Sequence, residues 1–536
     1  MMAKNYIKSI LINGFKKFQN FKIDFNASRN IFVGENEAGK STILDAIKLV
    51  LNQDYRHADK AVLSDLFNVD MVKSFKEHPS LENLPKIYIE VEFELDPKSK
   101  NAECFFGEHN CSKNGRYGIS FTCELNDELK DDVVLSTEAA EVPYEYYTLR
   151  WVTFSGMAYN LLKKPLKFLC LNTSEQGRYS SFNYYTKTVF DDLLENSEKI
   201  KLKNNFRTAL KKDFNAEPFP KMDNRTFGID NKKIILENIL SIFDKDVALE
   251  NHGSGMESLI KTEIALNSGD GFDVILMEEP ENHLSFTNMQ RMLQLVTGKN
   301  ETSQLIIATH SSMIASRLDL RNVFWITKEK AHSLNNVPAD VANFFSKAVN
   351  NNFLQLLLST KVILVEGPTE FLLVPEFYEQ LTQRTMSDDQ VTIISCNGIS
   401  YKKYLQIAEN THKRIAVITD NDKNTNNQIE NSEADNTKYQ EQQEYFSIFM
   451  DSDSEKWTWE VCLYESNKEK IEEILNPLID KKAKYKYHDQ DYGPYLGYML
   501  NHKADFAFKI LEDGLIKNGN IKAPEYVKEA IKWVSE

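Results

Sequence analysis

The sequence has no long hydrophobic runs and little cysteine. No stretch of 18 or more consecutive apolar residues occurs in its 536 residues, which excludes the usual membrane-spanning helix. The first residues contain neither a long apolar segment nor a small-residue cleavage site, so nothing there indicates secretion. Six cysteines without paired spacing are typical of reduced thiols. We therefore expect a cytoplasmic protein that has no contact with a membrane.

The chain also has fewer basic residues than acidic ones. The chain has 64 Lys and Arg residues against 79 Asp and Glu residues, which gives a net charge of −15. This balance argues against a protein that coats DNA with its whole surface, although it allows a local basic groove. The 42% of hydrophobic residues and 27% of charged residues are typical of a globular protein. At this length one hydrophobic core does not suffice, so we expect two or three domains.

Four side chains that can bind zinc lie between residues 104 and 123. They are Cys104, His109, Cys111 and Cys123, and their spacing matches no common zinc motif. We interpret them as separate side chains near strands and predict no zinc site there.

A phosphate-binding loop is predicted between residues 34 and 42. The stretch GENEAGKS matches G-x-x-x-x-G-K-[ST] at every fixed position, after the strand-like run NIFVG and before apolar residues at helical spacing. In such loops the backbone N–H groups surround the phosphates, the lysine neutralises the β and γ phosphates, and the serine hydroxyl binds Mg²⁺. The candidate nucleotide-binding residues are Asn36, Gly39, Lys40, Ser41 and Thr42, with Ser41 also a metal ligand.

Two further apolar runs end in residues suited to ATP hydrolysis. FDVILMEEPENHLS (272–285) contains Glu278, which we expect to bind the Mg²⁺ of the nucleotide, and Glu279, which we expect to polarise the attacking water. SQLIIATHSSMI (303–314) contains His310, which can sense the γ-phosphate. A capping or packing role is the alternative for this histidine.

These segments together resemble the ABC-type ATPases of DNA maintenance, a group that includes SMC, Rad50 and RecF-like proteins. The opening residues resemble their first hairpin, with Lys16 or Lys17 in place of the usual arginine. NHGSGMESLI (251–260) resembles their signature motif, although a glycine turn with a helix cap is the alternative. The resemblance implies that Ser254 and Gly255 bind the ATP of a second protomer, and hence a homodimer or a larger homo-oligomer.

More residues separate Lys40 from Glu278 than a bare ATPase core needs, which predicts an insertion. The stretch from about 155 to 245 reads as mostly helical, and we interpret it as an arm or dimerisation element. The predicted order is ATPase (1–154), helical insertion (155–245), ATPase (246–335), linker (336–360) and a C-terminal domain (361–536).

The C-terminal segment alternates strands and helices, which predicts a parallel α/β sheet. Glu366 and Asp420 each follow a strand-like run, with Glu370 one helical turn and Asp422 two residues further on. Ligands of such sheets bind beyond the carboxyl ends of the strands. Close carboxylates repel each other by roughly 4 kcal/mol per pair at an effective dielectric near 20. Divalent cations remove this repulsion, and oxygen ligands favour Mg²⁺ or Mn²⁺.

These acids resemble the TOPRIM domain of topoisomerases, primases and certain nucleases. Glu366 and Gly367 match its Glu-Gly turn, and Asp420 and Asp422 match its Asp-x-Asp motif. An ABC-type ATPase followed by a TOPRIM domain resembles the OLD (overcome lysogenization defect) family of ATP-dependent nucleases, which includes the Gabija nuclease and some retron effectors. The overall fold class is therefore α/β.

The resemblance also implies roles for individual residues. TWEVC keeps Thr458 and Glu460 of a later OLD motif, but Cys462 stands where an aspartate is expected. Lys503 resembles a late lysine that can neutralise the transition state, with a surface position as the alternative. The implied metal ligands at this site are Glu366, Glu370, Asp420, Asp422 and Glu460. The implied catalytic residues of the whole chain are Glu279, His310, Glu366, Asp420 and Lys503.

The leading hypothesis is an ATP-regulated, divalent-metal-dependent DNA endonuclease or nickase with ATP and Mg²⁺, or Mn²⁺, as cofactors. Family resemblance adds anti-phage defence and a second defence protein as partner, either helicase-like or a reverse transcriptase with its nucleic acid. The alternative is an ATPase that acts as a nucleic-acid or partner sensor, or as a scaffold, with an inactive TOPRIM site, and Cys462 favours it. A topoisomerase or primase is disfavoured, because neither a tyrosine in a winged-helix context nor a zinc module is visible.

Overall fold

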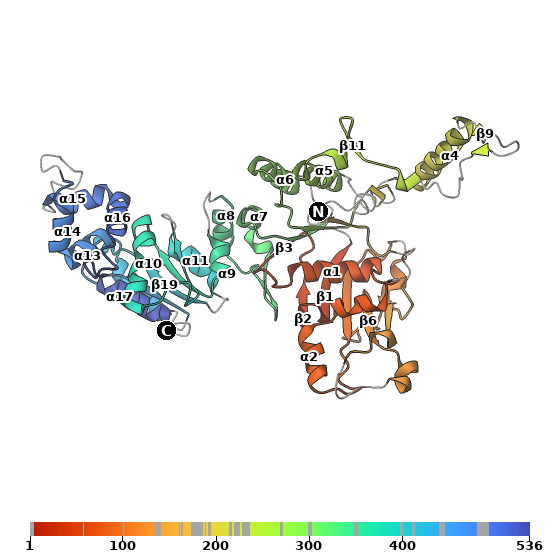
Figure 1. Cartoon of the computed structure of the whole chain (residues 1–536), viewed down its shortest axis with the longest axis horizontal. Helices are drawn as coiled ribbons and strands as arrows, with labels where there is room; N and C mark the ends of the chain where they lie inside the picture. Colours follow the sequence, from red (N-terminus) through yellow and green to blue (C-terminus); the bar gives the residue numbers. More distant parts are fainter. Residues whose placement is uncertain are drawn as a thin grey trace. The chain divides into compact units, whose positions relative to one another are not determined.

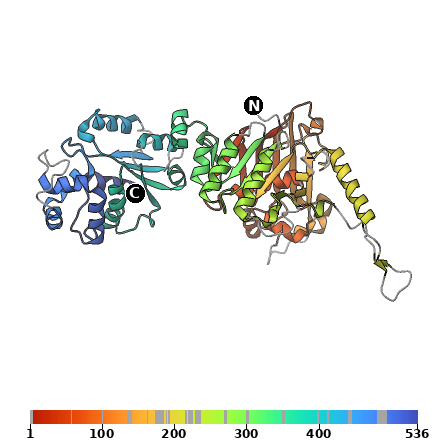
Figure 2. The ribbon, with the colours of Figure 1, turned by 90° about the horizontal axis from the view of Figure 1, so that it is seen from above.

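The computed structural model describes most of the chain, and the described residues form two compact units. The first unit contains residues 1–336 and 345–347, and the second contains residues 337–344 and 348–536. Figures 1 and 2 show the units as ribbons coloured along the sequence. No helix among the described residues has both the length and the apolar character needed to cross a membrane. The described residues are 5–56, 58–99, 101–133, 141–159, 161, 164–172, 186–187, 189–190, 194–213, 217–218, 226–227, 236–267, 272–298, 303–347, 352–396, 400–409, 413–438, 445–479 and 493–536.

The first unit begins with an antiparallel sheet in the order β2-β1-β4-β6-β5, with β7 also paired to β6. Its first two strands form the hairpin expected at the start of the chain. Apolar residues alternate along the strands, as at Ile87, Ile89, Val91 and Phe93, and face the core. The strands are β1 (Tyr6–Phe15), β2 (Phe18–Asp24), β4 (Ile87–Glu94), β5 (Phe106–Gly107), β6 (Arg116–Leu125) and β7 (Tyr147–Thr153).

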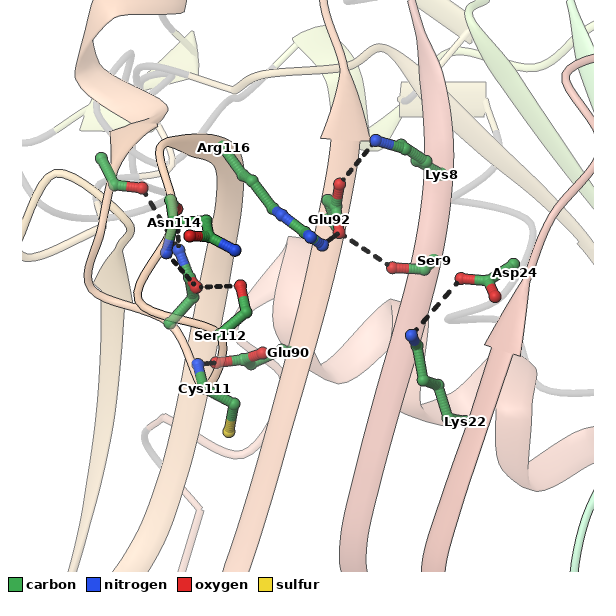
Figure 3. Close-up of polar contacts among 12 residues, drawn as sticks. Lys8, Ser9, Lys22, Asp24, Glu90, Glu92, Cys111, Ser112, Asn114 and Arg116 are labelled. Carbon is green, nitrogen blue, oxygen red and sulfur yellow. Dashed lines mark hydrogen bonds and ion pairs between the residues drawn. The ribbon is translucent and has the colours of Figure 1, made fainter.

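The outer face of this sheet carries a polar network (Figure 3). Glu92 forms ion pairs with Lys8 at 2.9 Å and Arg116 at 2.7 Å, and it accepts a hydrogen bond from the Ser9 hydroxyl at 3.2 Å. The same face holds Glu90, which accepts a hydrogen bond from the backbone N–H of Cys111.

The cysteines near this network lie on opposite sides of the sheet. Cys111 is exposed beside the outer face, whereas Cys123 on β6 is buried in the core beneath it. The sheet lies between these two thiols, so they cannot bind the same metal ion.

The second sheet of this unit has the order β16-β15-β3-β14-β13-β8 and is parallel except for β16. Its central strands are continuous apolar runs, as expected for strands buried on both faces. The strands are β3 (Arg29–Val33), β8 (Phe168–Asn172), β13 (Val274–Glu278), β14 (Gln304–Ala308), β15 (Val323–Ile326) and β16 (Ala331–Ser333).

Helix α1 (Lys40–Asn52) contacts both sheets, and one hydrophobic core joins all three elements. The remaining described helices of the unit are α2 (Val69–Glu77), α4 (Asn196–Asp213), α5 (Ser254–Asn267), α6 (Phe286–Gly298) and α7 (Ser312–Arg317). Four two-residue strands pair locally: β9 (Glu217–Pro218) with β10 (Thr226–Phe227), and β11 (Phe243–Asp244) with β12 (Val247–Ala248).

The range 155–245, for which the sequence predicts a helical insertion, also contains a strand of the ATPase sheet. Strand β8 lies in this range and pairs in parallel with β13, the strand that carries Glu278. The longest described helix of the range is α4. The domain boundaries and the arm remain predictions.

The second unit is built on a parallel sheet in the order β18-β17-β19-β20, which confirms the predicted parallel C-terminal fold. Helix α17 packs across β17, β19 and β20, and α10 contacts β18. The strands are β17 (Lys361–Val365), β18 (Val391–Ser395), β19 (Arg414–Ile418) and β20 (Phe446–Phe449). The helices are α8 (Ala339–Lys347), α9 (Phe353–Leu358), α10 (Pro368–Thr382), α11 (Tyr401–Ala408), α12 (Gln428–Lys438), α13 (Trp459–Ser466), α14 (Lys468–Leu475), α15 (Gly493–Asn501), α16 (Lys503–Glu512) and α17 (Glu525–Ser535).

Candidate active sites

The phosphate-binding loop joins β3 to α1 in the first unit. Gly39 has a φ of 104°, and a Cβ atom there would lie 2.4 Å from the ring of Phe18, so only glycine fits without strain. The Nζ of Lys40 donates hydrogen bonds to the carbonyls of Gly34 at 2.9 Å and Glu35 at 3.0 Å. The lysine charge is therefore held inside the loop where phosphates bind.

The other predicted loop residues lie around this lysine. Asn36 is exposed in the loop, whereas Ser41 and Thr42 belong to the first turn of α1. The two hairpin lysines that stand in place of the usual arginine both form ion pairs nearby. Lys16 bonds to Asp45 of α1 at 2.6 Å, and Lys17 bonds to Glu37 of the loop at 3.0 Å.

The acids after β13 face the same region. The backbone N–H of Glu279 donates to the carbonyl of Ala308 at 2.8 Å, which fixes the end of β13 against β14, and the Asn282 amide donates to the Glu279 carboxylate at 2.6 Å. The His310 imidazole lies 3.8 Å from that carboxylate. Burial lowers the pKa of Lys40, while Glu279 acts to raise it, so the two are close enough to interact.

The environment of His310 favours its neutral form. Burial and the positive charge of Lys40 lower the pKa of this histidine, although Glu279 opposes the shift. A neutral imidazole can accept or donate a hydrogen bond at neutral pH. The structure thus brings together Lys40, Glu279 and His310, three residues that are far apart in the sequence.

Glu281 is a residue that the sequence reading passed over. One carboxylate oxygen accepts hydrogen bonds from the Thr309 hydroxyl and from the His310 backbone N–H, both at 2.7 Å. The only sign of it in the sequence is that it is the third acid of EEPENHL, after Glu278 and Glu279.

The signature-like residues lie at the start of α5. A Cβ atom on Gly255 would lie 2.3 Å from the backbone carbonyl oxygen of His283, so this glycine packs against the turn that follows β13. Ser254 is the first residue of the same helix. Their binding to the nucleotide of a second protomer stays a prediction.

The second site lies at the carboxyl ends of β17 and β19, which are adjacent parallel strands. Glu366 directly follows β17, and Asp420 follows β19 after Thr419. The Thr419 hydroxyl donates to the Glu366 carboxylate at 3.2 Å, and the backbone N–H of Asp420 donates to the same oxygen at 3.5 Å. These acids, predicted to share one edge of the sheet, are therefore neighbours.

Residues from α13 and α16 complete the cluster. The Asp420 carboxylate lies 2.6 Å from the Thr458 hydroxyl and accepts a hydrogen bond from the backbone N–H of Trp459 at 2.9 Å. The same hydroxyl lies 3.0 Å from Glu460, which is 1% exposed. The Nζ of Lys503 donates to Glu460 at 2.9 Å.

The cluster holds more negative charge than its one lysine balances. Burial, together with the Glu460 and Glu366 carboxylates, raises the pKa of Glu370 to about 7. Burial and the neighbouring carboxylates also raise the pKa of Asp420 well above its usual range. Burial acts to lower the pKa of Lys503, but Glu460 outweighs it and the pKa is raised.

Asp422 is exposed, as Glu366 is, whereas Glu370 and Glu460 are buried. It has a φ of 51° and begins a short 3₁₀ turn. A cavity of about 350 Å³ is lined by this residue together with Glu366 and Asp420. Asp422 thus borders the same space as Glu366 and Asp420.

The residue between the two aspartates of the motif holds their loop in place. Asn421 is 1% exposed, and its side-chain amide donates to the backbone carbonyls of Asp451 at 2.8 Å, Asp453 at 2.9 Å and Lys456 at 3.3 Å. The sequence reading missed this role. The only local sign of it is an asparagine between the two aspartates of Asp-Asn-Asp.

Cys462 does not replace the expected aspartate chemically. It is 3% exposed, and its thiol donates to the carbonyl of Lys456 at 3.3 Å. Burial raises the pKa of this thiol to about 12, so it stays neutral at neutral pH. A neutral thiol is a poor ligand for Mg²⁺, which prefers oxygen.

The donor chemistry of the clustered acids fits a hard divalent cation, because all the candidate ligands are carboxylate oxygens that repel one another. Their present arrangement is not a finished metal site. In the described part of the chain, no group of three or more His, Cys, Asp or Glu side chains is arranged to hold a metal ion. Binding therefore requires some of these carboxylates to leave the hydrogen bonds they now make.

Comparisons with known families match both units. The family described as "AAA domain" matches residues 9–245, and the family described as "Overcoming lysogenization defect protein-like, TOPRIM domain" matches residues 357–422. The second range contains Glu366, Glu370, Asp420 and Asp422. The first range contains the phosphate-binding loop.

Individual proteins are similar to parts of the chain. An "ATP/GTP phosphatase" of Helicobacter pylori is 22% identical over 342 residues, which cover 58% of this chain and 87% of that protein. The "Structural maintenance of chromosomes protein 3" of Saccharomyces cerevisiae is 42% identical over 52 residues, or 9% of this chain and 4% of that protein. The chain thus spans only a small part of the yeast protein. The crystal structure of an SMC head bound to the C-terminal winged-helix domain of ScpA has a TM-score of 0.35 and 16% identity, and it covers 62% of this chain and 100% of that chain.

The two matches lie in a fixed order along the chain. The AAA-type ATPase domain comes first, with its phosphate-binding loop after β3, and a parallel four-stranded sheet follows. The chain thus combines an AAA-type ATPase domain with a TOPRIM domain of the overcoming lysogenization defect (OLD) type.

Proposed function

We propose that the chain is an ATP-regulated, divalent-metal-dependent DNA endonuclease or nickase. The observation that carries this proposal is the convergence of four carboxylates and one lysine at the ends of β17 and β19. These residues are Glu366, Glu370, Asp420, Glu460 and Lys503. Structural ion-pair networks balance their charges, whereas this group has four acids for one base.

Glu366, Glu370, Asp420 and Glu460 would hold divalent cations, with Asp422 at the edge of the site. When bound, such cations supply a Lewis acid and a nucleophilic water for the cleavage of a phosphodiester. Lys503 supplies the one positive charge of the cluster and can stabilise charge that develops on the phosphate. Thr458 and Asn421 orient the acids and the loop that carries them.

The first unit is the ATP-binding part. Asn36, Gly39, Lys40, Ser41 and Thr42 would bind the triphosphate, and Ser41 with Glu278 would bind its Mg²⁺. Glu279 would polarise the attacking water beside His310. The signature-like pair Ser254 and Gly255 would complete this site in a second copy, so we propose a homodimer or larger homo-oligomer.

The biological setting is a finer proposal that rests on the resemblance to the OLD family. Nucleotide-gated cleavage of DNA suits anti-phage defence, with a second defence protein that is helicase-like or a reverse transcriptase with its nucleic acid. The identity of neighbouring genes tests this setting: genes of neither kind beside this one would count against it.

A second candidate function is an ATPase that acts as a nucleic-acid or partner sensor, or as a scaffold, with an inactive TOPRIM site. The specific observation in its favour is Cys462, a buried neutral thiol in place of an acidic ligand.

A plasmid assay separates the two functions. Supercoiled DNA is incubated with the full chain in Mg²⁺ or Mn²⁺, with and without ATP, and Glu366→Gln serves as the inactive variant. The nuclease predicts metal-dependent nicking that nucleotide alters and that the variant lacks. Equal or absent nicking by both proteins, with ATP binding intact, would favour the sensor.

A further inference from the structure

Glu281 lies in the turn after β13, two residues beyond Glu279, and the proposed chemistry gives it no role. Its Oε1 atom accepts hydrogen bonds from the Thr309 hydroxyl and from the His310 backbone N–H, both at 2.7 Å. Bonds of this kind to a charged acceptor are about twice as strong as neutral ones. The turn after β13 is therefore tied to the residues that follow β14.

The first of these bonds reaches the interior of the ATPase sheet. Thr309 is fully buried, and its backbone N–H donates to the carbonyl of Phe32 on β3 at 3.0 Å. Its hydroxyl, besides donating to Glu281, accepts the backbone N–H of Ser311 at 2.9 Å. Strand β3 leads into the phosphate-binding loop, so Thr309 connects Glu281 to the strand that positions Lys40.

The second bond holds the backbone of His310. The His310 imidazole is partly exposed and lies 3.8 Å from Glu279. Glu281, Thr309 and His310 thus form one hydrogen-bonded unit. Loss of Glu281 would release the His310 backbone and let the imidazole move away from Glu279.

The second oxygen of Glu281 is also distinctive. Oε2 is buried and has no hydrogen-bond partner among the described residues. A buried acceptor of this kind normally receives a hydrogen bond from water or a ligand. Glu281 is near enough to Lys40 and His310 to act on the charge of each.

We propose that Glu281 is a positioning residue of the ATPase site, which fixes the His310 imidazole beside Glu279 through Thr309 and the His310 backbone. This inference rests on the proposed hydrolysis of ATP at that site. It assigns Glu281 no direct contact with the nucleotide, and its effect on the reaction passes through His310.

The test is a set of steady-state ATPase measurements on the full chain with Glu281→Gln and Glu281→Ala. The glutamine keeps an oxygen that can accept both bonds, so we expect kcat within about threefold of the unaltered chain. The alanine removes both bonds, so we expect kcat to fall at least tenfold while KM for ATP changes less than about threefold. Glu82→Ala, at an exposed acid elsewhere in the unit, is the control and should change neither constant.

A double-mutant cycle with His310→Ala shows whether the effect passes through the imidazole. We expect Glu281→Ala to reduce kcat no further once His310 is alanine. An undiminished effect of Glu281→Ala in that background would overturn the inference, as would a loss in Glu281→Gln equal to that in Glu281→Ala. The latter result would mean that the carboxylate acts as a base.

Variants of Thr309 provide an independent test if Glu281→Ala does not fold. Thr309→Val removes the hydroxyl and should lower kcat, and Thr309→Ser should restore it. Equal kcat values in these two variants would contradict the inference. Hydrolysis by the unaltered chain tests the proposed function separately, because a chain that hydrolyses no ATP refutes both, whereas normal hydrolysis with insensitive variants refutes only the role of Glu281.

Discussion

Lys503 and Glu460 form the one ion pair that the described residues make within the acidic cluster at the ends of β17 and β19, with the lysine Nζ 2.9 Å from the carboxylate. The Glu460 side chain is 2% exposed, whereas that of Lys503 is 47% exposed. The glutamate is therefore buried, and the lysine reaches it from a surface helix. This pair places a positive charge at the edge of a site that is otherwise acidic.

Lys503→Met tests that charge. We expect DNA cleavage to fall at least 100-fold, because no other cationic side chain in the described part of the chain forms an ion pair with these acids. Stability should fall by only about 1–2 kcal/mol, since water can reach Glu460 through the space the lysine leaves. Lys509→Met on the same helix is the control, and comparable loss of cleavage in both variants would contradict the assignment.

Thr458→Val removes the hydroxyl that lies between Asp420 and Glu460 while keeping the shape of the side chain. The hydroxyl has one proton and lies within hydrogen-bond distance of both carboxylates, so one acceptor loses its donor. We therefore expect the free energy of unfolding to fall by about 1–3 kcal/mol in metal-free buffer. Thr458→Ser should restore most of that loss. Urea denaturation of the three proteins measures it, and a valine variant as stable as the unaltered chain would show that the hydroxyl contributes nothing.

The raised pKa of Glu370 predicts a pH dependence of the metal-free chain. Because the folded pKa, about 7, lies above the ordinary value of 4.5, the folded state binds more protons between these limits. Glu370 therefore makes its full contribution to the free energy of unfolding below about pH 4.5. This contribution falls by roughly 3 kcal/mol as the pH rises to about 7.

Unfolding in EDTA across this pH range measures the effect, with Glu370→Gln as the comparison. The glutamine variant cannot ionise, so its stability should decline less over the same range. Added Mg²⁺ should stabilise the unaltered chain more at pH 8 than at pH 5. Parallel curves for the two proteins would refute the assignment.

Gly39→Ala tests the conformation of the phosphate-binding loop. The new Cβ would lie 2.4 Å from the Phe18 ring at a φ of 104°, so the loop must shift. We expect at least a tenfold loss of ATP affinity, measured with a fluorescent nucleotide. Gly519→Ala has a φ of 73° but no atom within 4 Å of the new Cβ, and it should leave ATP affinity unchanged. Unchanged affinity in Gly39→Ala would show that the loop tolerates the shift.

The parts of the structure that follow from local patterns could be predicted from the sequence. The phosphate-binding loop is a continuous motif between a strand and a helix, and Lys40 is fixed by it. Glu366 and Asp420 are far apart in the chain, but each follows an apolar strand. The carboxyl ends of parallel strands meet at one edge, which is enough to predict that these two acids are neighbours.

Other features depend on how loops that are far apart in the sequence meet in the fold, and no local sequence pattern predicts them. Glu281 has a partner only because the turns after β13 and β14 lie side by side. Asn421 reaches carbonyls more than 25 residues away, as set by a loop path that the sequence does not show. Strand β8 lies within a range that reads as helical, and its pairing with β13 is a long-range contact.

The central claim is that the clustered acids at the ends of β17 and β19 hold divalent cations that support DNA cleavage, and Asp420→Asn tests it most directly. The asparagine keeps the oxygen that accepts the backbone N–H of Trp459, places an NH2 group that can donate to the Thr458 hydroxyl, and removes the charge. In a supercoiled-plasmid assay with Mg²⁺ or Mn²⁺ and ATP, we predict nicking by the unaltered chain. The variant should nick at least 1000-fold more slowly while it binds ATP and unfolds as before. Metal-dependent nicking by Asp420→Asn at the unaltered rate would contradict the account.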